Sequence, residues 1–409
     1  MQLVERHIID RNYQMFEECD RLCFASKNIY NRALYLIKQD YESTGEYNVL
    51  NNLFAVIKNE ECYQYLPCNV LQQTLRILQK NWKSYFGLLK AKAKGKLEDD
   101  VIVNPPKFLN KKYGRFVCVY TERVISKKVF NKAHKVKLSQ CNIEVPTKIE
   151  KFDDIACARI IPEPDRYVLE IVYNVPDIEI DMDSEPVYAS MDIGVNNLGA
   201  IYIHKAGCES FIINGRPLKS INQHFNKNLA HDRSILDKQN SKYKSSHRIK
   251  DLSNKRTDKI NDYLHKASKI VVDRFKKAGV TIFVIGKNDY WKQGSNIGDA
   301  NNQNFVMIPH SRFISMLQYK CERVGIQVVL TEERYTSLCS SIDNESVEKH
   351  EHYAGKRTSR GMFQSKDGTL INADINAAIN ILRKVVPNCL QQNGIEGLVV
   401  SPLNITVKN

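Results

Sequence analysis

Apolar residues recur at helical spacing through the first quarter of the chain. One run covers about residues 12–39, and a second, more regular run extends from Leu71 to Leu89. Side chains three and four positions apart share a helix face, so each run predicts an amphipathic helix. Pro105 and Pro106 interrupt the pattern, because proline cannot continue a helix interior. The region up to about residue 105 is therefore predicted to be mostly helical.

Strand patterns follow the two prolines. Residues 116–120 and 167–175 are rich in β-branched and aromatic side chains, which favour strands. They predict a small β domain over about residues 106–182. The acidic run at 177–185 predicts a linker, with a solvated surface strand as the alternative.

The second half of the chain alternates strands and helices. Residues 187–213 predict a meander whose first strand ends at Asp192. Two further strands and two helices are predicted at 280–285, 311–324, 326–330 and 373–386. Asn372 is placed to cap the last helix. This order of elements predicts an α/β core.

The composition is that of a globular protein with nucleic acid as its first candidate partner. Of 409 residues, 43% are hydrophobic and 26% charged, and the net charge is +14, which favours polyanions. No apolar window approaches about eighteen residues, and residues 1–10 lack the apolar core of a signal peptide. The 11 cysteines form no C-x-x-C pair. We therefore expect a cytoplasmic protein with reduced thiols and no membrane partner.

The positive charge is concentrated in two segments. Residues 219–277 carry 16 Lys or Arg and 6 Asp, a net +10, and the segment from Leu71 to Leu97 has seven basic residues and no acid. An apolar seam in the first segment predicts a basic amphipathic helix or hairpin docked on the core. Phosphate contact is the functional interpretation, and a solvated face is the alternative. The candidate nucleic-acid-binding residues are Lys80, Lys83, Lys90, Arg248, Lys255 and Lys259.

Four acids could meet at one edge of the predicted sheet. Asp192 ends a core strand, Glu332 and Glu333 end a second, and Asp374 opens a helix that can pack beside both. Mg²⁺ takes carboxylate ligands, and phosphodiester hydrolysis needs such ions. Each acid also has a plain alternative: a turn, a solvated strand end, or a favourable charge at the positive end of a helix.

Longer motifs resemble a known family. These are S-M-D-I-G-V-N-N-L-G-A from Ser190, T-S-L-C from Thr336, I-N-A-D-I-N-A-A-I-N-I-L from Ile371, and L-Q-Q-T-L-R-I-L-Q-K-N-W-K-S-Y-F from Leu71 with N-P-P-K-F after it. Together with the basic segment, they resemble the TnpB family of transposon-encoded, RNA-guided DNA endonucleases, ancestral to the type V CRISPR effectors.

The resemblance implies a RuvC-like nuclease with an RNase H fold, joined to an N-terminal wedge-like β-barrel in which a helical recognition lobe is inserted. The implied parts are a barrel at 1–10 and 106–182, a helical lobe at 11–105, a nuclease domain at 183–337 and 371–388, a degenerate zinc-finger-like insert at 338–370, and a tail at 389–409.

It also implies the catalytic acids. Asp192 matches the first aspartate of the family and Asp374 the last, but Gly286 stands where the middle glutamate is common. Either the nuclease is inactive or the acid has moved, as in some relatives including Fanzor proteins. Glu333, three positions before Thr336, is then expected to replace it, with Glu332 as the alternative.

The implied function is RNA-guided, Mg²⁺-dependent cleavage of double-stranded DNA beside a short flanking motif. The cofactor would be a pair of Mg²⁺ ions, which Mn²⁺ could replace, and the partners are a guide RNA and target DNA, with a monomer expected. Cys339 lacks the companions of a zinc finger, so no structural zinc is expected. The alternatives are a nuclease-inactive RNA-guided repressor, suggested by Gly286, and a CRISPR effector whose guide has another origin.

Overall fold

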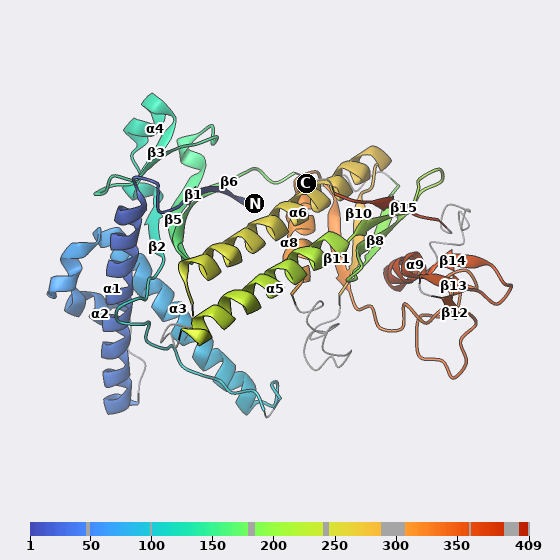
Figure 1. Cartoon of the computed structure of the whole chain (residues 1–409), viewed down its shortest axis with the longest axis horizontal. Helices are drawn as coiled ribbons and strands as arrows, with labels where there is room; N and C mark the ends of the chain where they lie inside the picture. Colours follow the sequence, from blue (N-terminus) through green and yellow to red (C-terminus); the bar gives the residue numbers. More distant parts are fainter. Residues whose placement is uncertain are drawn as a thin grey trace. The chain divides into compact units, whose positions relative to one another are not determined.

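The chain forms two compact units, Met1–Pro176 and Asp177–Asn409, seen in Figure 1. This computed structural model describes residues 1–45, 50–98, 100–178, 185–239, 245–287, 307–359, 361–387 and 401–407. Most of the acidic run predicted as a linker, residues 179–184, lies outside the described residues. No helix in the described ranges is long and apolar enough to cross a lipid bilayer.

Unit 1 combines helices with a four-stranded antiparallel sheet of order β1-β6-β5-β2. Its helices are α1 (Phe16–Thr44), α2 (Leu50–Lys58), α3 (Cys68–Ala93) and α4 (Lys127–Ala133), with short 3₁₀ turns at Glu61–Tyr65, Glu122–Val124 and Phe152–Asp154. Its strands are β1 (Gln2–Ile9), β2 (Cys118–Thr121), β3 (Lys135–Lys137), β4 (Glu144–Pro146), β5 (Ile155–Glu163) and β6 (Arg166–Asn174). The helical first part and the strands at 118–121 and 166–174 agree with the sequence pattern.

The sheet of unit 1 joins the first residues of the chain to the predicted β domain. β1 pairs along its whole length with β6, from Gln2 opposite Asn174 to Ile9 opposite Tyr167. β3 and β4 form a separate two-stranded ribbon. Among the described residues no pairing closes β1 onto β2, so the barrel remains a prediction.

Unit 2 is built on a six-stranded sheet of order β11-β10-β7-β8-β9-β15. The strands are β7 (Tyr188–Asp192), β8 (Asn197–His204), β9 (Phe211–Asn214), β10 (Ile282–Gly286), β11 (Gln327–Thr331) and β15 (Leu403–Ile405). The helices are α5 (Arg216–Lys238), α6 (His247–Ala278), α8 (His310–Glu322) and α9 (Ala373–Val385), and β12 (Lys356–Ser359), β13 (Met362–Gln364) and β14 (Leu370–Asn372) form a small separate sheet. β7, β8 and β9 are the predicted antiparallel meander, and β10 and β11 are parallel to β7 and to each other.

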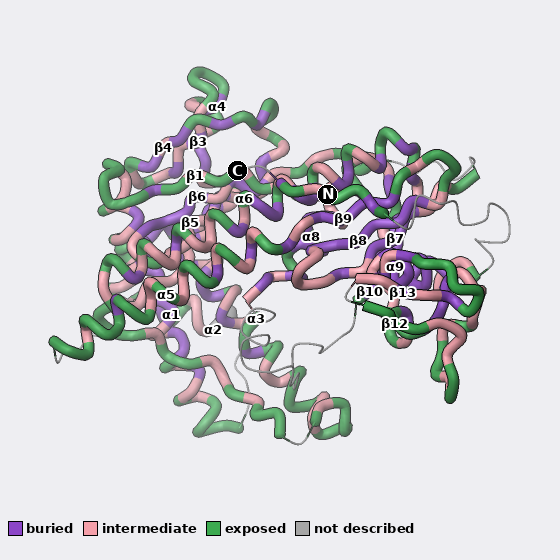
Figure 2. The backbone as a smooth tube through the Cα atoms, turned by 45° about the vertical axis from the view of Figure 1, so that its right-hand side comes forward, coloured by how far each residue is buried: buried purple, intermediate pink, exposed green. Residues whose placement is uncertain are grey.

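Apolar side chains on both faces of the sheet explain its two helical layers. Phe283 and Ile285 of β10 face a core shared with α6 and α8, whereas Val284 faces the core that includes Ile379 of α9. Side chains alternate between faces along a strand, so a strand buried on both sides needs helices on both sides. Figure 2 shows the buried residues concentrated along these strands and α9.

The C-terminal segment corrects one expectation. Residues 389–409 are predicted as a tail, but β15 adds to the sheet edge, with Leu403 opposite Phe211. A strand of three residues is too short to leave a periodic signal in the sequence.

Candidate active site

Three parallel strands of unit 2 end side by side. β7 ends at Asp192, β10 at Gly286 and β11 at Thr331, and the register pairs Ile285 with Met191 and Gly286 with Thr331. Gly286 therefore lies between the strand that carries Asp192 and the strand that precedes Glu333. Even-numbered residues of β10 face α9, as Val284 does, so a side chain at position 286 would lie on the face of the sheet covered by this helix.

Asp192 is surrounded by negative charge. Burial raises the pKa of its carboxyl group well above the usual range, and the neighbouring charges of Glu333 and Asp374 raise it further, while Arg357 opposes them. A carboxyl group that loses water and gains like-charged neighbours holds its proton more tightly. Glu333 and Asp374, the other two acids expected from the sequence, thus lie within electrostatic reach of Asp192.

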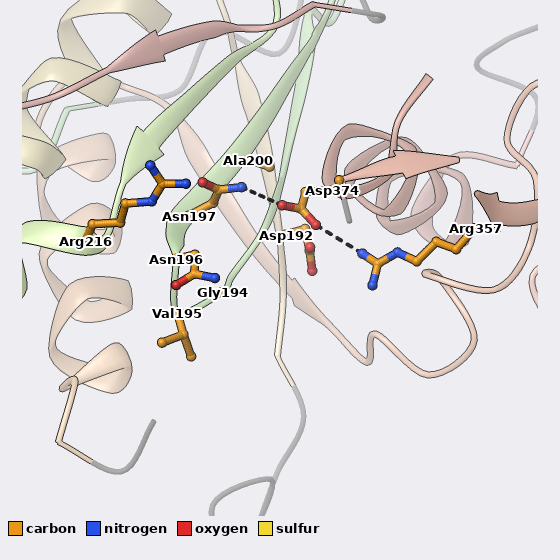
Figure 3. Close-up of a pocket in the computed structure, with 10 residues that line it drawn as sticks. Asp192, Gly194, Val195, Asn196, Asn197, Ala200, Arg216, Arg357 and Asp374 are labelled. Atoms are coloured by element: carbon orange, nitrogen blue, oxygen red, sulfur yellow. Dashed lines mark hydrogen bonds and ion pairs between the residues drawn. The ribbon is translucent and has the colours of Figure 1, made fainter. Parts of the chain in front are cut away.

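Asp374 lies in the first turn of α9 and is held by two side chains. The Asn372 side chain caps the helix by accepting hydrogen bonds from the backbone N–H groups of Asp374 (3.1 Å) and Ile375 (3.2 Å). Asn197 Nδ2 donates to Asp374 Oδ2 at 2.6 Å, and Arg357 Nη2 lies 3.3 Å from Asp374 Oδ1. Figure 3 shows these contacts beside the Asp192 carboxylate.

These groups line one pocket of about 440 Å³. Its lining residues are Asp192, Gly194, Val195, Asn196, Asn197, Ala200, Arg216, Arg357, Gly361 and Asp374. Sequence reasoning missed Asn197, Arg216 and Arg357 as site residues. Asn197 lies inside the quoted motif from Ser190, whereas nothing in the sequence marks Arg357, which reaches Asp374 from the small sheet.

Glu333 occupies the space beside Gly286. A Cβ atom added to Gly286 would lie 3.2 Å from Glu333 Oε2, and 2.5 Å from Cδ1 of the buried Ile381 on α9. The carboxylate of Glu333 thus lies next to the point at which a side chain at position 286 would begin. Burial raises the pKa of Glu333 to about 7, with the charge of Lys384 acting in the opposite direction.

Glu332 points elsewhere. It is exposed, and its Oε1 lies 3.3 Å from Arg334 Nε. Side chains one position apart in an extended segment face opposite sides, and Glu333 is two positions beyond Thr331, the last residue of β11. The placement therefore favours Glu333 over Glu332 as the neighbour of Asp192.

The donor chemistry of Asp192, Glu333 and Asp374 fits Mg²⁺, which prefers carboxylate oxygens. A bound cation would also offset the negative charges of Glu333 and Asp374 that raise the pKa of Asp192. The side chains are not gathered around one point in this state. In the described part of the chain, no group of three or more His, Cys, Asp or Glu side chains lies close enough to hold one ion, and Asp374 is engaged by Arg357.

The basic segment forms the predicted helical hairpin, α5 and α6, which lie side by side in Figure 1. Ser246 caps α6 by accepting from Ile249 N at 3.3 Å, and Gly279 ends the helix with φ of 72°, in the left-handed region that favours glycine. Exposed Arg248 is tied to the buried Asp232 (3.1 Å) and exposed Lys255 to Asp251 (2.8 Å).

The other basic candidates also reach solvent. Lys259 is exposed on α6, and Lys80, Lys83 and Lys90 are exposed on α3 of unit 1. Arg256 differs from them, because it is folded into unit 2, donating to Asn222 Oδ1 at 2.7 Å and to the Met307 carbonyl at 3.1 Å. Charge counting alone does not separate this structural arginine from its exposed neighbours.

Comparisons with known proteins find similarity in two segments of the chain and along most of its length. Residues 170–291 match the probable transposase family OrfB of IS605, and residues 310–381 match the TNB domain of Cas12f1-like proteins. The TnpB-like protein ORF457 of Acidianus two-tailed virus is 20% identical over 400 residues, 90% of this chain and 83% of that protein. This chain is similar to the TnpB family.

CRISPR-associated proteins are also similar to this chain. The CRISPR-associated endodeoxyribonuclease Cas12f2 of a Micrarchaeota archaeon (strain CG1_02_47_40) is 27% identical over 239 residues, 54% of this chain but only 41% of that protein. The structure of a Cas12f1–sgRNA–target DNA complex has 15% sequence identity and a TM-score of 0.34, and the match covers 93% of this chain and 98% of that chain. A structure of CasPhi-2 (Cas12j) bound to crRNA and phosphorothioate-DNA has 8% sequence identity and a TM-score of 0.40. The match covers 97% of this chain and 92% of that chain. TM-scores below 0.5 do not by themselves establish a shared fold.

Proposed function

We propose that this protein is a member of the TnpB family and an RNA-guided, Mg²⁺-dependent DNA endonuclease. The observation that carries the proposal is the placement of Glu333 beside Gly286, at the sheet edge where Asp192 ends β7 and next to the helix that begins with Asp374. A carboxylate lost from β10 is replaced by one from the segment after the adjacent strand. Three acids on three elements are thus retained.

The strand order supports a RuvC-like nuclease domain with an RNase H fold. An antiparallel meander, β7-β8-β9, is followed by two parallel strands added beside β7, with helices on both faces. The wider division follows the family: 1–10 and 106–182 as a wedge-like barrel, 11–105 as a helical recognition lobe, 183–337 and 371–388 as the nuclease, and 338–370 as the insert.

The catalytic roles follow from the site. Asp192, Glu333 and Asp374 would hold Mg²⁺, which when bound supplies the activation of water and the stabilisation of the leaving oxygen. Asn197 orients the Asp374 carboxylate through its 2.6 Å hydrogen bond. Arg357 places a positive charge at the pocket, where the DNA backbone would bring its phosphate.

The partners are a guide RNA and double-stranded target DNA in a prokaryotic cytoplasm. The exposed cations Arg248, Lys255 and Lys259 on α6 would contact the phosphate backbone, and those of α3 would do so in unit 1. Guide pairing would supply most of the sequence specificity, with a short flanking motif read by the protein.

The test begins with the full chain, expressed from its native locus and purified with any RNA that it binds. Bound RNA is sequenced, and a DNA duplex matched to the guide is offered in Mg²⁺ and in Mn²⁺, with an unmatched duplex and the Asp192→Ala variant as controls. We expect guided cleavage that Asp192→Ala abolishes. Guided binding without cleavage in either metal would refute the nuclease and favour a repressor. A CRISPR array or transposon ends beside the gene would decide the origin of the guide.

A further inference from the structure

One face of α9 is polar although it is buried. Asn376, Asn380, Arg383 and Lys384 follow one another at spacings of four, three and one residues, which places them on one side of the helix. Both asparagines are completely buried, and Arg383 is 7% exposed. Buried polar groups are costly unless they are hydrogen-bonded, so this face, called the α9 clamp below, needs partners.

The partners of the two asparagines are backbone groups of the segment after β11. Nδ2 of Asn376 and Nδ2 of Asn380 both donate to the Cys339 carbonyl, at 2.9 and 2.7 Å. Asn380 also donates to the Thr336 carbonyl at 3.0 Å, and Asn376 Oδ1 accepts from the N–H of Ser341 at 2.9 Å. The two asparagine side chains thus form hydrogen bonds with backbone groups of the irregular segment 336–341. In a sheet, the backbone of a neighbouring strand would provide such hydrogen bonds.

Lys384 completes the clamp around Glu333. Its Nζ donates to the carbonyls of Glu332 (3.0 Å) and Arg334 (2.7 Å), the residues on either side. The carbonyl of Glu333 itself accepts from Thr336 Oγ1 at 2.8 Å. Three successive carbonyls are therefore fixed by side chains.

The backbone beside Glu333 is also in an uncommon conformation. Tyr335 has φ of 68°, the left-handed region that residues other than glycine seldom adopt. Such a conformation persists when the surrounding contacts determine it. The clamp supplies those contacts, with Lys384 on the preceding carbonyl and Asn380 on the following one.

We infer that Lys384 is a positioning residue for the relocated glutamate, fixing the backbone on both sides of Glu333 so that its carboxylate stays beside Gly286. The inference rests on the proposed function. A glutamate on β10 would be fixed by the ladder of the sheet, whereas Glu333 lies on a turn beyond the last paired residue of β11. Metal ligands and catalytic groups lose function when displaced by about 1 Å, so a ligand on a turn needs other supports.

The clamp also links two of the acids. Asp374 is in the first turn of α9 and Lys384 in its last turn. The same rigid helix therefore carries one acid and holds the segment of another, which fixes the distance between Asp374 and Glu333.

The test measures metal binding as well as cleavage. Lys384→Met keeps the length of the side chain and removes both hydrogen bonds, and Lys384→Arg retains donors that can reach the two carbonyls. Lys349→Met, an exposed lysine of the same unit, is the matched control for loss of one charge. Mn²⁺ binding to the guide-loaded full chain is followed by electron paramagnetic resonance. Binding by the Asp192→Ala/Asp374→Ala variant on the same RNA is subtracted, which removes the contribution of the RNA.

We expect Lys384→Met to weaken Mn²⁺ binding about tenfold, equivalent to about 1.4 kcal/mol, and to slow cleavage, with target binding unchanged. Lys384→Arg should stay within about threefold, and Lys349→Met should have no effect. In a Glu333→Gln background, Lys384→Met should change Mn²⁺ affinity by less than about twofold, because the residue through which it acts is already neutral.

Two results would overturn the inference, and they differ in what else they refute. In the first, Glu333→Gln weakens Mn²⁺ binding, but Lys384→Met either has no effect or has the same effect with Glu333 and with Gln at position 333. Lys384 is then not a positioning residue, while the proposed role of Glu333 stands. If Glu333→Gln itself leaves Mn²⁺ binding and cleavage unchanged, both the inference and the relocation of the glutamate are wrong.

Discussion

Gly286→Ala should destabilise unit 2 through contact with one side chain of α9. The added Cβ would lie 2.5 Å from Ile381 Cδ1 and 3.1 Å from its Cγ1, whereas carbon atoms pack best about 3.5–4.0 Å apart. Ile381 is fully buried, so its side chain has little room to move. Overpacking of this kind costs about 1–3 kcal/mol, and alanine returns about 0.4–1 kcal/mol by restricting the unfolded chain.

The net loss is about 0.5–2 kcal/mol in the free energy of unfolding, measured by urea denaturation followed by circular dichroism. Ile381→Val removes the Cδ1 atom and alone should cost about 0.5–1.5 kcal/mol. Combined with Gly286→Ala it should cost about 1 kcal/mol less than the sum of the single changes, because the clash is relieved. Gly87→Ala on α3 is the control, since nothing lies within 4 Å of its added Cβ, and it should stabilise the protein by about 0.5–1 kcal/mol.

Additive effects of Gly286→Ala and Ile381→Val, within about 0.5 kcal/mol, would refute the contact between these positions. The same variants bear on function, because the added methyl group would also lie 3.2 Å from Glu333 Oε2. Cleavage by Gly286→Ala should therefore fall below that of the unchanged protein, and Ile381→Val should not restore it fully.

Three further outcomes are expected. Reversing the charges of Arg248, Lys255 and Lys259 together should weaken guide binding. It should also reduce the slope of log affinity against log salt concentration by about three units, since each phosphate contact contributes about one. An unchanged slope would show that these side chains face solvent and do not contact the RNA. Asp192→Ala and Asp374→Ala should each abolish cleavage and leave guided DNA binding nearly intact, and loss of both would mark these acids as structural. Elemental analysis should find well under one zinc per chain, and stoichiometric zinc would disprove the expectation for the insert.

The sequence predicts those site residues that lie at the ends of strands and helices. The pattern of apolar and polar residues locates the end of β7 at Asp192, and the capping residue Asn372 locates the start of α9 next to Asp374. Both signals are local in the sequence. The expectation of Glu333 rather than Glu332 comes from the family resemblance, through its position three residues before Thr336, and the Glu333 carboxylate lies beside Gly286 in the structure.

The remaining contacts depend on tertiary structure. Arg357 reaches Asp374 from β12, a strand of four exposed residues with no apolar pattern. Asn376 and Asn380 read as polar positions on an amphipathic helix, yet they are buried because an irregular segment packs on them. Neither arrangement has a periodic signal in the sequence, since both depend on how distant segments fold against the sheet.

The central claim is that Glu333 has replaced the acid missing at Gly286. Its most direct test compares single-turnover cleavage of a matched DNA duplex by Glu333→Gln and Glu332→Gln in Mg²⁺, with target binding measured in parallel. Glu333→Gln should slow cleavage by at least about 100-fold, equivalent to about 2.7 kcal/mol, with binding preserved, while Glu332→Gln stays within about threefold. Undiminished cleavage by Glu333→Gln would contradict the relocation.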